Sequence, residues 1–171
     1  MKKYLGIIVV MVLAVTTSFA QKAELKFGHI NSNELLSLMP ERDSAQVQLK
    51  KYSDMLQKEM QSMQTEYQTK VNDYLEKQAT LTDLVKKTKE SELQEMQGRI
   101  QDFQNEAQQD YQQKQAELFQ PVMDKAQKAI EKVAKANGFI YIFDLGSGSV
   151  LYHSDQSIDI LPLVKKELGI Q

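Results

Sequence analysis

Few residues in this sequence have the types and spacing that chemistry requires. His29 and His153 are the two histidines, and each lies in a candidate strand without metal-ligand spacing around it. We expect both to be ordinary structural or surface histidines, so the sequence predicts no metal site. Asp144 follows the most strongly predicted strand, but no second acid or nucleophile is placed beside it. This isolation favours a turn or capping role for Asp144.

Other catalytic and cofactor chemistry has equally little support. Residues 146–148 read Gly-Ser-Gly and resemble a phosphate loop, but the Walker lysine and a following helix are missing. The sequence contains no cysteine, which removes thiol catalysis, thiolate metal ligands and disulfide bonds. Because it also has no Ser-His-Asp set and no defensible acid pair, we predict that the chain is not an enzyme and uses no cofactor.

Residues 42–136 make up most of the sequence, so the structure of this stretch must position any functional residue. This stretch has no glycine except Gly98 and no proline except Pro121, and it is rich in Gln, Lys, Glu and Ala. These residues favour helix, and the apolar residues between them recur in steps of three and four. Because polar positions outnumber apolar ones, we expect long, mostly solvated helices with a narrow apolar seam.

The apolar seam repeats closer to every eleven residues than to every seven. Two of its rows are Tyr52, Met63, Tyr74 and Val85, and Met96, Ala107, Leu118 and Ala129. An eleven-residue period predicts straight or slightly right-handed pairing. The rows break at residues 80–91, and Ser91 with Gln94 resembles a helix-opening capping box. We therefore predict an antiparallel helical hairpin with its tip near 80–91 and arms about 65 Å long.

Pro121 interrupts the second predicted helix. Proline removes a helical hydrogen bond and crowds the preceding turn, so we expect a kink at residues 117–121. Two interpretations stay open, a bend where the arm enters the body and a working hinge.

Residues 1–20 have the pattern of a secretory signal peptide. Lys2 and Lys3 precede a short apolar run, and small residues lead to a cleavage site between Ala20 and Gln21. An uncleaved N-terminal anchor is the alternative. Cleavage changes the net charge from −2 to about −4, which argues against nucleic acid as a partner.

Two short segments, 21–41 and 137–171, flank the hairpin. The pattern of segment 21–41 predicts a strand at 27–31 and a helix at 32–38 capped by Asn31. The second predicts an antiparallel strand pair, 139–143 with 150–153, and a last helix capped by Ser157 or Asp159 and ended by Gly169. The predicted core residues are Phe27, Ile30, Leu35, Leu36, Phe139, Tyr141, Phe143, Val150, Leu151, Ile160, Leu161, Val164 and Leu168.

These flanking segments together hold about 56 residues, a size at which a lone core is marginal. We therefore predict an α+β, mostly α chain in which the small β body is shared between the subunits of a homo-oligomer. Met and Tyr on the arms make adaptable apolar contacts. Most of them belong to the seam, but some are candidates for contacting an unfolded partner: Met60, Met63, Tyr67, Tyr74, Leu81, Leu84, Val85 and Met96.

The order of these features resembles the Skp/OmpH family of periplasmic chaperones for outer membrane proteins. The most specific part is residues 118–144, which read LFQPVMDKAQKAIEKVAKANGFIYIFD, and the resemblance covers the whole mature chain. It implies a homotrimer with a β body built from three subunits and three helical tentacles around a cavity. In that cavity an ATP-independent holdase binds unfolded outer membrane β-barrel proteins and prevents their aggregation.

The sequence departs from the family in its charge. Members with strongly basic tentacles attract acidic clients and lipopolysaccharide, whereas this chain is mildly acidic. Contact with membrane or lipopolysaccharide therefore stays open, and Lys86, Lys87 and Lys89 are best interpreted as a solubilising surface. The alternative to a chaperone is a structural coiled-coil spacer or adaptor of the cell envelope.

Overall fold

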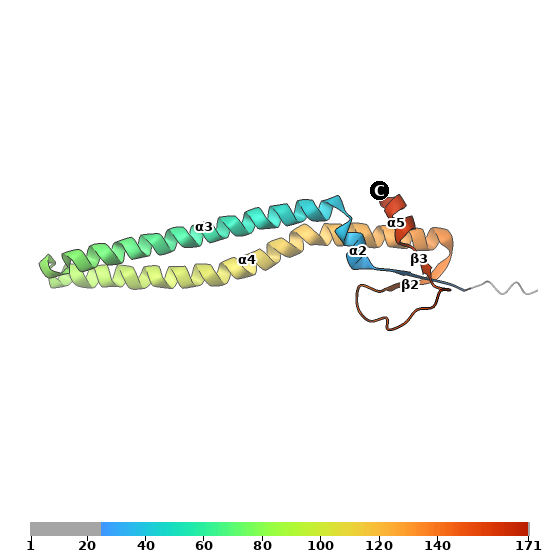
Figure 1. Ribbon diagram of the computed structural model, residues 1–171. Coiled ribbons are helices and arrows are strands. Elements are labelled where there is room, and N and C mark those ends of the chain that lie inside the picture. Colours follow the sequence, from blue (N-terminus) through green and yellow to red (C-terminus); the bar gives the residue numbers. More distant parts are fainter. Residues whose placement is uncertain (1–24, 171) are drawn as a thin grey trace, which may run out of the picture.

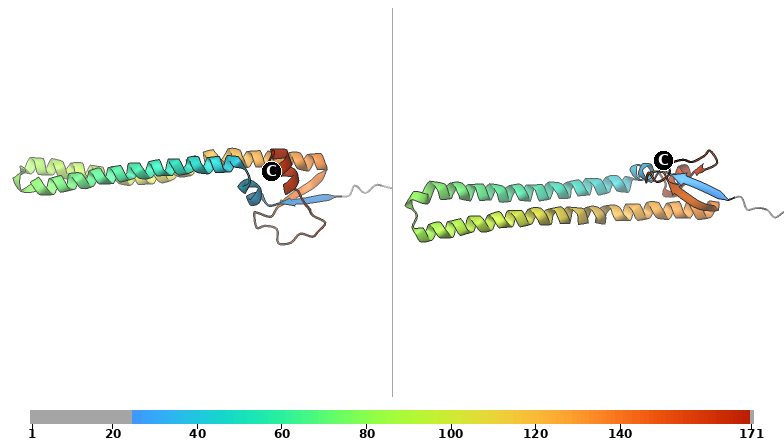
Figure 2. Two further views of the ribbon diagram at one scale, coloured as in Figure 1. Left: turned by 45° about the horizontal axis from the view of Figure 1, so that its top comes forward. Right: turned by 90° about the horizontal axis from the view of Figure 1, so that it is seen from below.

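The protein is a long helical hairpin that projects from a small body (Figure 1). The computed structural model describes residues 25–170, so the predicted signal peptide lies outside the described residues. In chain order the elements are β1 (Lys26–Ile30), α2 (Ser32–Ser37), α3 (Pro40–Lys77), η1 (Gln78–Thr80), α4 (Asp83–Asn137), β2 (Phe139–Asp144), β3 (Ile158–Asp159) and α5 (Leu161–Leu168). This arrangement confirms the predicted mostly helical α+β fold, and Figure 2 shows α3 and α4 side by side from two further directions.

Local signals at their ends set the bounds of the two long helices. Pro40 occupies the first turn of α3, where its missing N–H costs nothing. The Thr82 hydroxyl accepts a hydrogen bond from the Val85 N–H and caps α4, while Gly138 ends α4 in the left-handed conformation that glycine favours. The predicted tip at 80–91 overlaps the turn at 78–82. The predicted helix start at Ser91 is wrong, because the cap is at Thr82, nine positions before Ser91, and α4 begins at Asp83.

Proline does not break the second arm. Helix α4 continues through Pro121. Figure 1 shows α4 bending in its yellow-to-orange part. The kink predicted at residues 117–121 stays a prediction. At the same level a hydrogen bond from Lys125 Nζ to the Glu41 carboxylate joins α4 to the first turn of α3 and lowers the pKa of Glu41.

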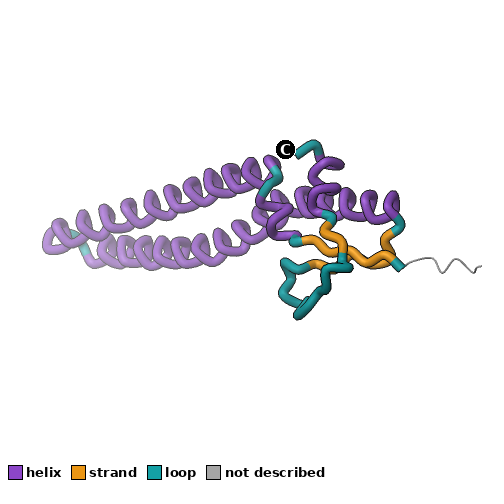
Figure 3. Tube along the Cα trace, turned by 45° about the vertical axis from the view of Figure 1, so that its right-hand side comes forward, coloured by secondary structure: helices purple, strands orange, loops and turns teal. Residues whose placement is uncertain are grey.

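The body contains a three-stranded parallel sheet with the order β2-β1-β3. The predicted antiparallel pairing of 139–143 with 150–153 is wrong: β2 pairs with β1, and residues 145–157 form a loop, drawn in teal in Figure 3. The whole helical hairpin connects β1 to β2, so the chain enters both strands in the same direction, as parallel pairing requires.

One face of this sheet packs against the helices. The buried cluster combines Ile30 of β1, Leu35 of α2 and Val164 of α5 with small and β-branched residues of α4. Gly28 allows this close packing, because a Cβ there would lie 2.8 Å from Ile142 Cδ1. Helix α5 is also fastened to α4 by an ion pair between Glu167 and Lys132 at 2.5 Å.

The last helix was predicted with a side-chain cap. The structural N-cap is Ile160, which makes no side-chain cap hydrogen bond, but Asp159 Oδ1 accepts the Leu161 N–H at 2.9 Å. Gly169 ends the helix as predicted.

Asp144 ties the end of β2 to the start of α2. Its Oδ1 accepts the N–H groups of Ser32 at 3.0 Å and Gly146 at 2.8 Å, and its Oδ2 accepts the Ser32 hydroxyl at 2.6 Å. The predicted turn or capping role is confirmed. Burial acts to raise the pKa of Asp144, but these hydrogen bonds outweigh burial and lower it.

Replacing this carboxylate should weaken the body in a pH-dependent way. Asp144→Asn is expected to lower the free energy of unfolding by about 1–2 kcal/mol at pH 7, since it removes hydrogen bonds to a charged acceptor. Because the folded-state pKa is lowered, this stability is present above the unfolded pKa of about 3.9 and is lost as the pH falls through the folded value. Urea unfolding at pH 7 and near pH 3 measures both, with exposed Asp155→Asn as control. An unchanged difference at pH 3 would contradict the assignment.

Candidate functional site

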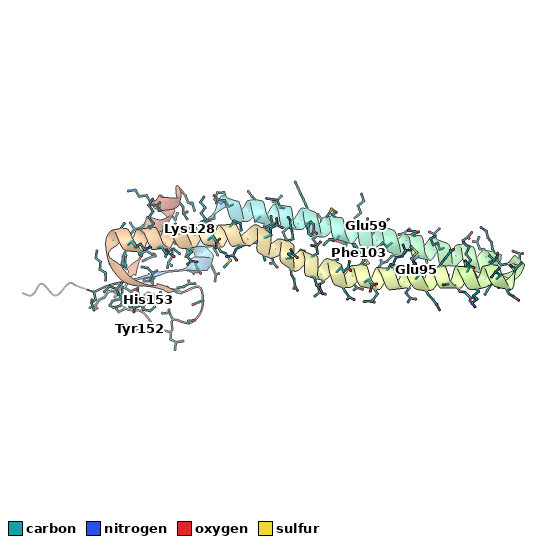
Figure 4. All side chains as sticks on the ribbon, turned by 180° about the vertical axis from the view of Figure 1, so that it is seen from behind. Glu59, Glu95, Phe103, Lys128, Tyr152 and His153 are labelled. Carbon is teal, nitrogen blue, oxygen red and sulfur yellow. The ribbon has the colours of Figure 1, made fainter. Side chains whose placement is uncertain are left out.

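The arms pair through a narrow apolar seam that contains most of the predicted contact residues. Tyr74 and Met96 are packed in this seam, with 8% and 2% of their surface exposed. Four further candidates are half-buried along it, namely Met60, Met63, Tyr67 and Leu81. Figure 4 shows Phe103 in the space between the two helices. The seam explains why these positions are apolar, and it leaves only part of their surface for another molecule.

Tyrosine hydroxyls fasten the two arms at the edge of the seam. Tyr52 donates to Asp110, and Tyr74 donates to Glu90 Oε1 at 2.5 Å. Both hydrogen bonds raise the pKa of the tyrosine, because they favour its protonated form. Gln78 Nε2 also donates to the Tyr74 hydroxyl, at 3.2 Å. These contacts fix the antiparallel register of α3 and α4 at two levels of the arm.

Leu84 and Val85 differ from the other candidates. They lie in the first turn of α4 at the tip, with 76% and 39% of their surface exposed. The basic run that includes Lys86 and Lys89 begins beside them, and these two lysines form only long ion pairs of 4.0 and 3.4 Å with Asp83 and Glu92. The tip therefore presents apolar side chains to solvent among charged side chains of both signs.

The eight candidates do not include a second set of exposed apolar residues on the arms. They lie outside the seam, and they are Val47, Met55, Leu75 and Met123. The sequence feature that could have identified them as exposed is that they fall outside the eleven-residue rows. Most other outward positions are polar, with helical ion pairs such as Lys50–Asp54 at 3.0 Å, which are typical of a solvated face.

The outer face of the sheet is a second uncovered apolar surface. Phe27, Tyr141 and Phe143 stack on it with ring centroids 6.1–6.5 Å apart, and all three are exposed. Sequence reasoning placed them in the core, whereas the helices cover only the opposite face. Parallel sheets are normally covered on both faces, so this face lacks a layer within the described chain.

The two histidines meet beside this outer face. Their ring centroids lie 4.3 Å apart, and His29 Nδ1 is hydrogen-bonded to the Ser157 hydroxyl at 2.8 Å. A cleft of about 990 Å³ lies between β1 and the 145–157 loop. Residues 25–170 contain no group of three His, Cys, Asp or Glu side chains placed to hold a metal ion. These contacts attach the returning part of the loop to the strand and give both histidines structural partners.

None of the helices in residues 25–170 combines the length and hydrophobicity needed to cross a membrane.

Comparisons with known proteins point to one family. The family model described as "Outer membrane protein (OmpH-like)" matches residues 26–168. Among solved structures, a candidate outer membrane chaperone (OmpH-like) from Caulobacter crescentus is similar with a TM-score of 0.72, 16% identity and 85% coverage of each chain. At that identity the likeness establishes the fold alone. No curated protein matches the sequence significantly.

Proposed function

The chain belongs to the OmpH-like outer membrane protein family, and from this premise we propose that it is an ATP-independent periplasmic holdase for unfolded outer membrane β-barrel proteins. Family membership supports a non-enzymatic role. The predicted signal peptide supports export to the periplasm.

The observation that carries the proposal is the surface of the arms. Helices of 38 and 55 residues are joined along one narrow seam, and apolar side chains outside the seam face solvent. A rigid spacer needs no such side chains far from the body. An unfolded chain exposes short apolar segments, which scattered Leu, Met and Val side chains can bind weakly at many points.

We further propose that three copies assemble through the body. The uncovered aromatic face of the sheet supports assembly because exposed apolar surface is unfavourable in contact with water. The open strand edges support it because their backbone groups can pair with another strand. Three arms would then surround one cavity. The client would be retained by avidity, since many weak contacts act together while each breaks quickly.

Binding alone would supply the protection. A holdase lowers the concentration of free unfolded chain and so slows aggregation without consuming ATP. The test dilutes a urea-unfolded outer membrane β-barrel protein into buffer with the mature chain at one trimer per client and follows turbidity. We expect aggregation to be suppressed. Unchanged turbidity, together with capture of one folded envelope protein in stoichiometric amount, would favour the spacer alternative.

The exposed tip should contribute measurably to binding. Replacing Leu84 and Val85 together by serine is expected to weaken the apparent affinity for the client about fivefold, which corresponds to about 1 kcal/mol of lost apolar contact. The control is Val47→Ser, an exposed apolar position at the base of the same hairpin. Both proteins should keep the circular dichroism of the wild type, because the replaced side chains are exposed. Equal effects at tip and base would contradict a special role for the tip.

A further inference from the structure

The sulfur chemistry of this chain belongs to methionine alone. The sequence contains eight methionines and no cysteine. Thiolates normally react first with a peroxide, so their absence leaves the methionine thioethers as the sulfur that a peroxide can oxidise. Met1 and Met11 precede the described residues, and the structure describes the other methionines. The positions of these described methionines decide which sulfur atoms an oxidant meets first.

Most of the described methionines are packed. Met39 in the body and Met96 in the seam are 1% and 2% exposed, which keeps solvent away from their side chains. Met60 and Met63 are half-buried between the two arms. Oxidation at a buried position would place a polar sulfoxide oxygen within apolar packing and disrupt that packing. Burial therefore protects the fold from an oxidant.

Met55 of α3 and Met123 of α4 have the opposite environment. They are 55% and 53% exposed. Met123 follows buried Val122 in the sequence, but it lies outside the buried cluster of the body and outside the partly buried side chains packed against that cluster. Both methionines belong to the exposed apolar set on the arms that carries the proposed contact with an unfolded client. An oxidant would therefore reach these two sulfur atoms first, where packing depends on them least.

We propose that Met55 and Met123 form a reversible oxidation site through which a peroxide weakens the hold of the arms on an unfolded client. In this reaction the thioether sulfur attacks one oxygen of hydrogen peroxide. The S–O bond forms as the O–O bond breaks, sulfur is oxidised by two electrons, and the second oxygen leaves as water with both protons. The product is a polar sulfoxide, so each site loses an apolar contact with the client. The inference deepens the proposed function and rests on it for this consequence.

Peptide mass mapping tests the order of oxidation. The folded mature chain is treated with dilute hydrogen peroxide, which catalase then removes. We expect Met55 and Met123 to gain one oxygen each well before Met39 and Met96 do, with unchanged helicity by circular dichroism. Methionine sulfoxide reductases A and B, one for each sulfoxide epimer, should remove both oxygens. Equally early oxidation of Met39 or Met96, or a loss of helicity, would overturn the proposal.

A binding measurement tests the consequence for the client. Peroxide-treated protein, freed of peroxide, should bind a urea-unfolded outer membrane β-barrel protein roughly threefold more weakly than the same protein untreated, because two apolar contacts become polar. Met55→Leu with Met123→Leu cannot form a sulfoxide at either site, so treatment should leave the affinity of this variant at its own untreated value. The matched control Met60→Leu with Met63→Leu should lose affinity on treatment as the wild type does.

The two variants also separate this inference from the proposed function. Equal losses of affinity in both variants on treatment would contradict a role for Met55 and Met123. If the untreated wild type does not bind the client, the proposed function fails. The oxidation map and the repair by the reductases then still decide whether these two methionines are the modification site.

Discussion

Removing residues 56–77 and 86–107 together should abolish protection of an unfolded β-barrel protein while leaving the body assembled. The deletion takes two complete seam repeats from each arm and keeps the natural turn at 78–82. It shortens the arm by about 33 Å at about 1.5 Å per residue. Turbidity of the diluted client should then rise to the level seen without the protein, because the shortened arms can no longer surround the client and five of the eight candidate contact residues are lost.

The register of the hairpin makes this deletion feasible. Tyr52 contacts Asp110 and Tyr74 contacts Glu90, so the excised segments face one another across the seam. Loss of whole eleven-residue repeats keeps the remaining apolar rows aligned. Light scattering provides the control, since the shortened chain should form the same number of copies as the wild type. A shortened protein that still protects the client fully would place binding in the body instead of the arms.

The second large effect concerns the core of the body. Leu35→Ala is expected to lower the free energy of unfolding by about 3 kcal/mol, because Leu35 is completely buried and the change leaves a cavity among α2, α4 and α5. Leu38→Ala is the matched control and should cost less than about 1 kcal/mol, since Leu38 is exposed. Urea unfolding followed by tyrosine fluorescence measures both variants. Equal losses would show that the body is not held by this cluster.

Much of the fold could be predicted from local signals. The apolar rows of residues 42–136 predict the hairpin, because a three-and-four spacing is specific to helix. Asn31, Gly138 and Gly169 act at helix ends as predicted, since capping depends on neighbouring residues only. The role of Asp144 followed from its isolation in the sequence, although its partner Ser32 could not be identified there.

The errors concern pairing between distant segments. Residues 150–153 have strong strand propensity, but β2 pairs with β1 and the hydrogen bonds of Asp144 to Ser32 and Gly146 turn the chain directly after β2. The aromatic residues of β2 were assigned to a core, yet sequence alternation does not tell which face the helices cover. Among the candidate contact residues, Met96 is packed and Leu84 is exposed. The sequence could not predict this difference in exposure, because both residues are simply apolar.

The parallel connection also has a consequence for the order of folding. Ser32 at the start of α2 and Asp144 at the end of β2 are hydrogen-bonded to each other although they are 112 positions apart. The N-terminal strand therefore stays unpaired until nearly the entire polypeptide is present. Contacts so distant along the chain slow folding, whereas the helical hairpin closes through a short turn. We therefore expect the two long helices to pair early and the sheet to form last.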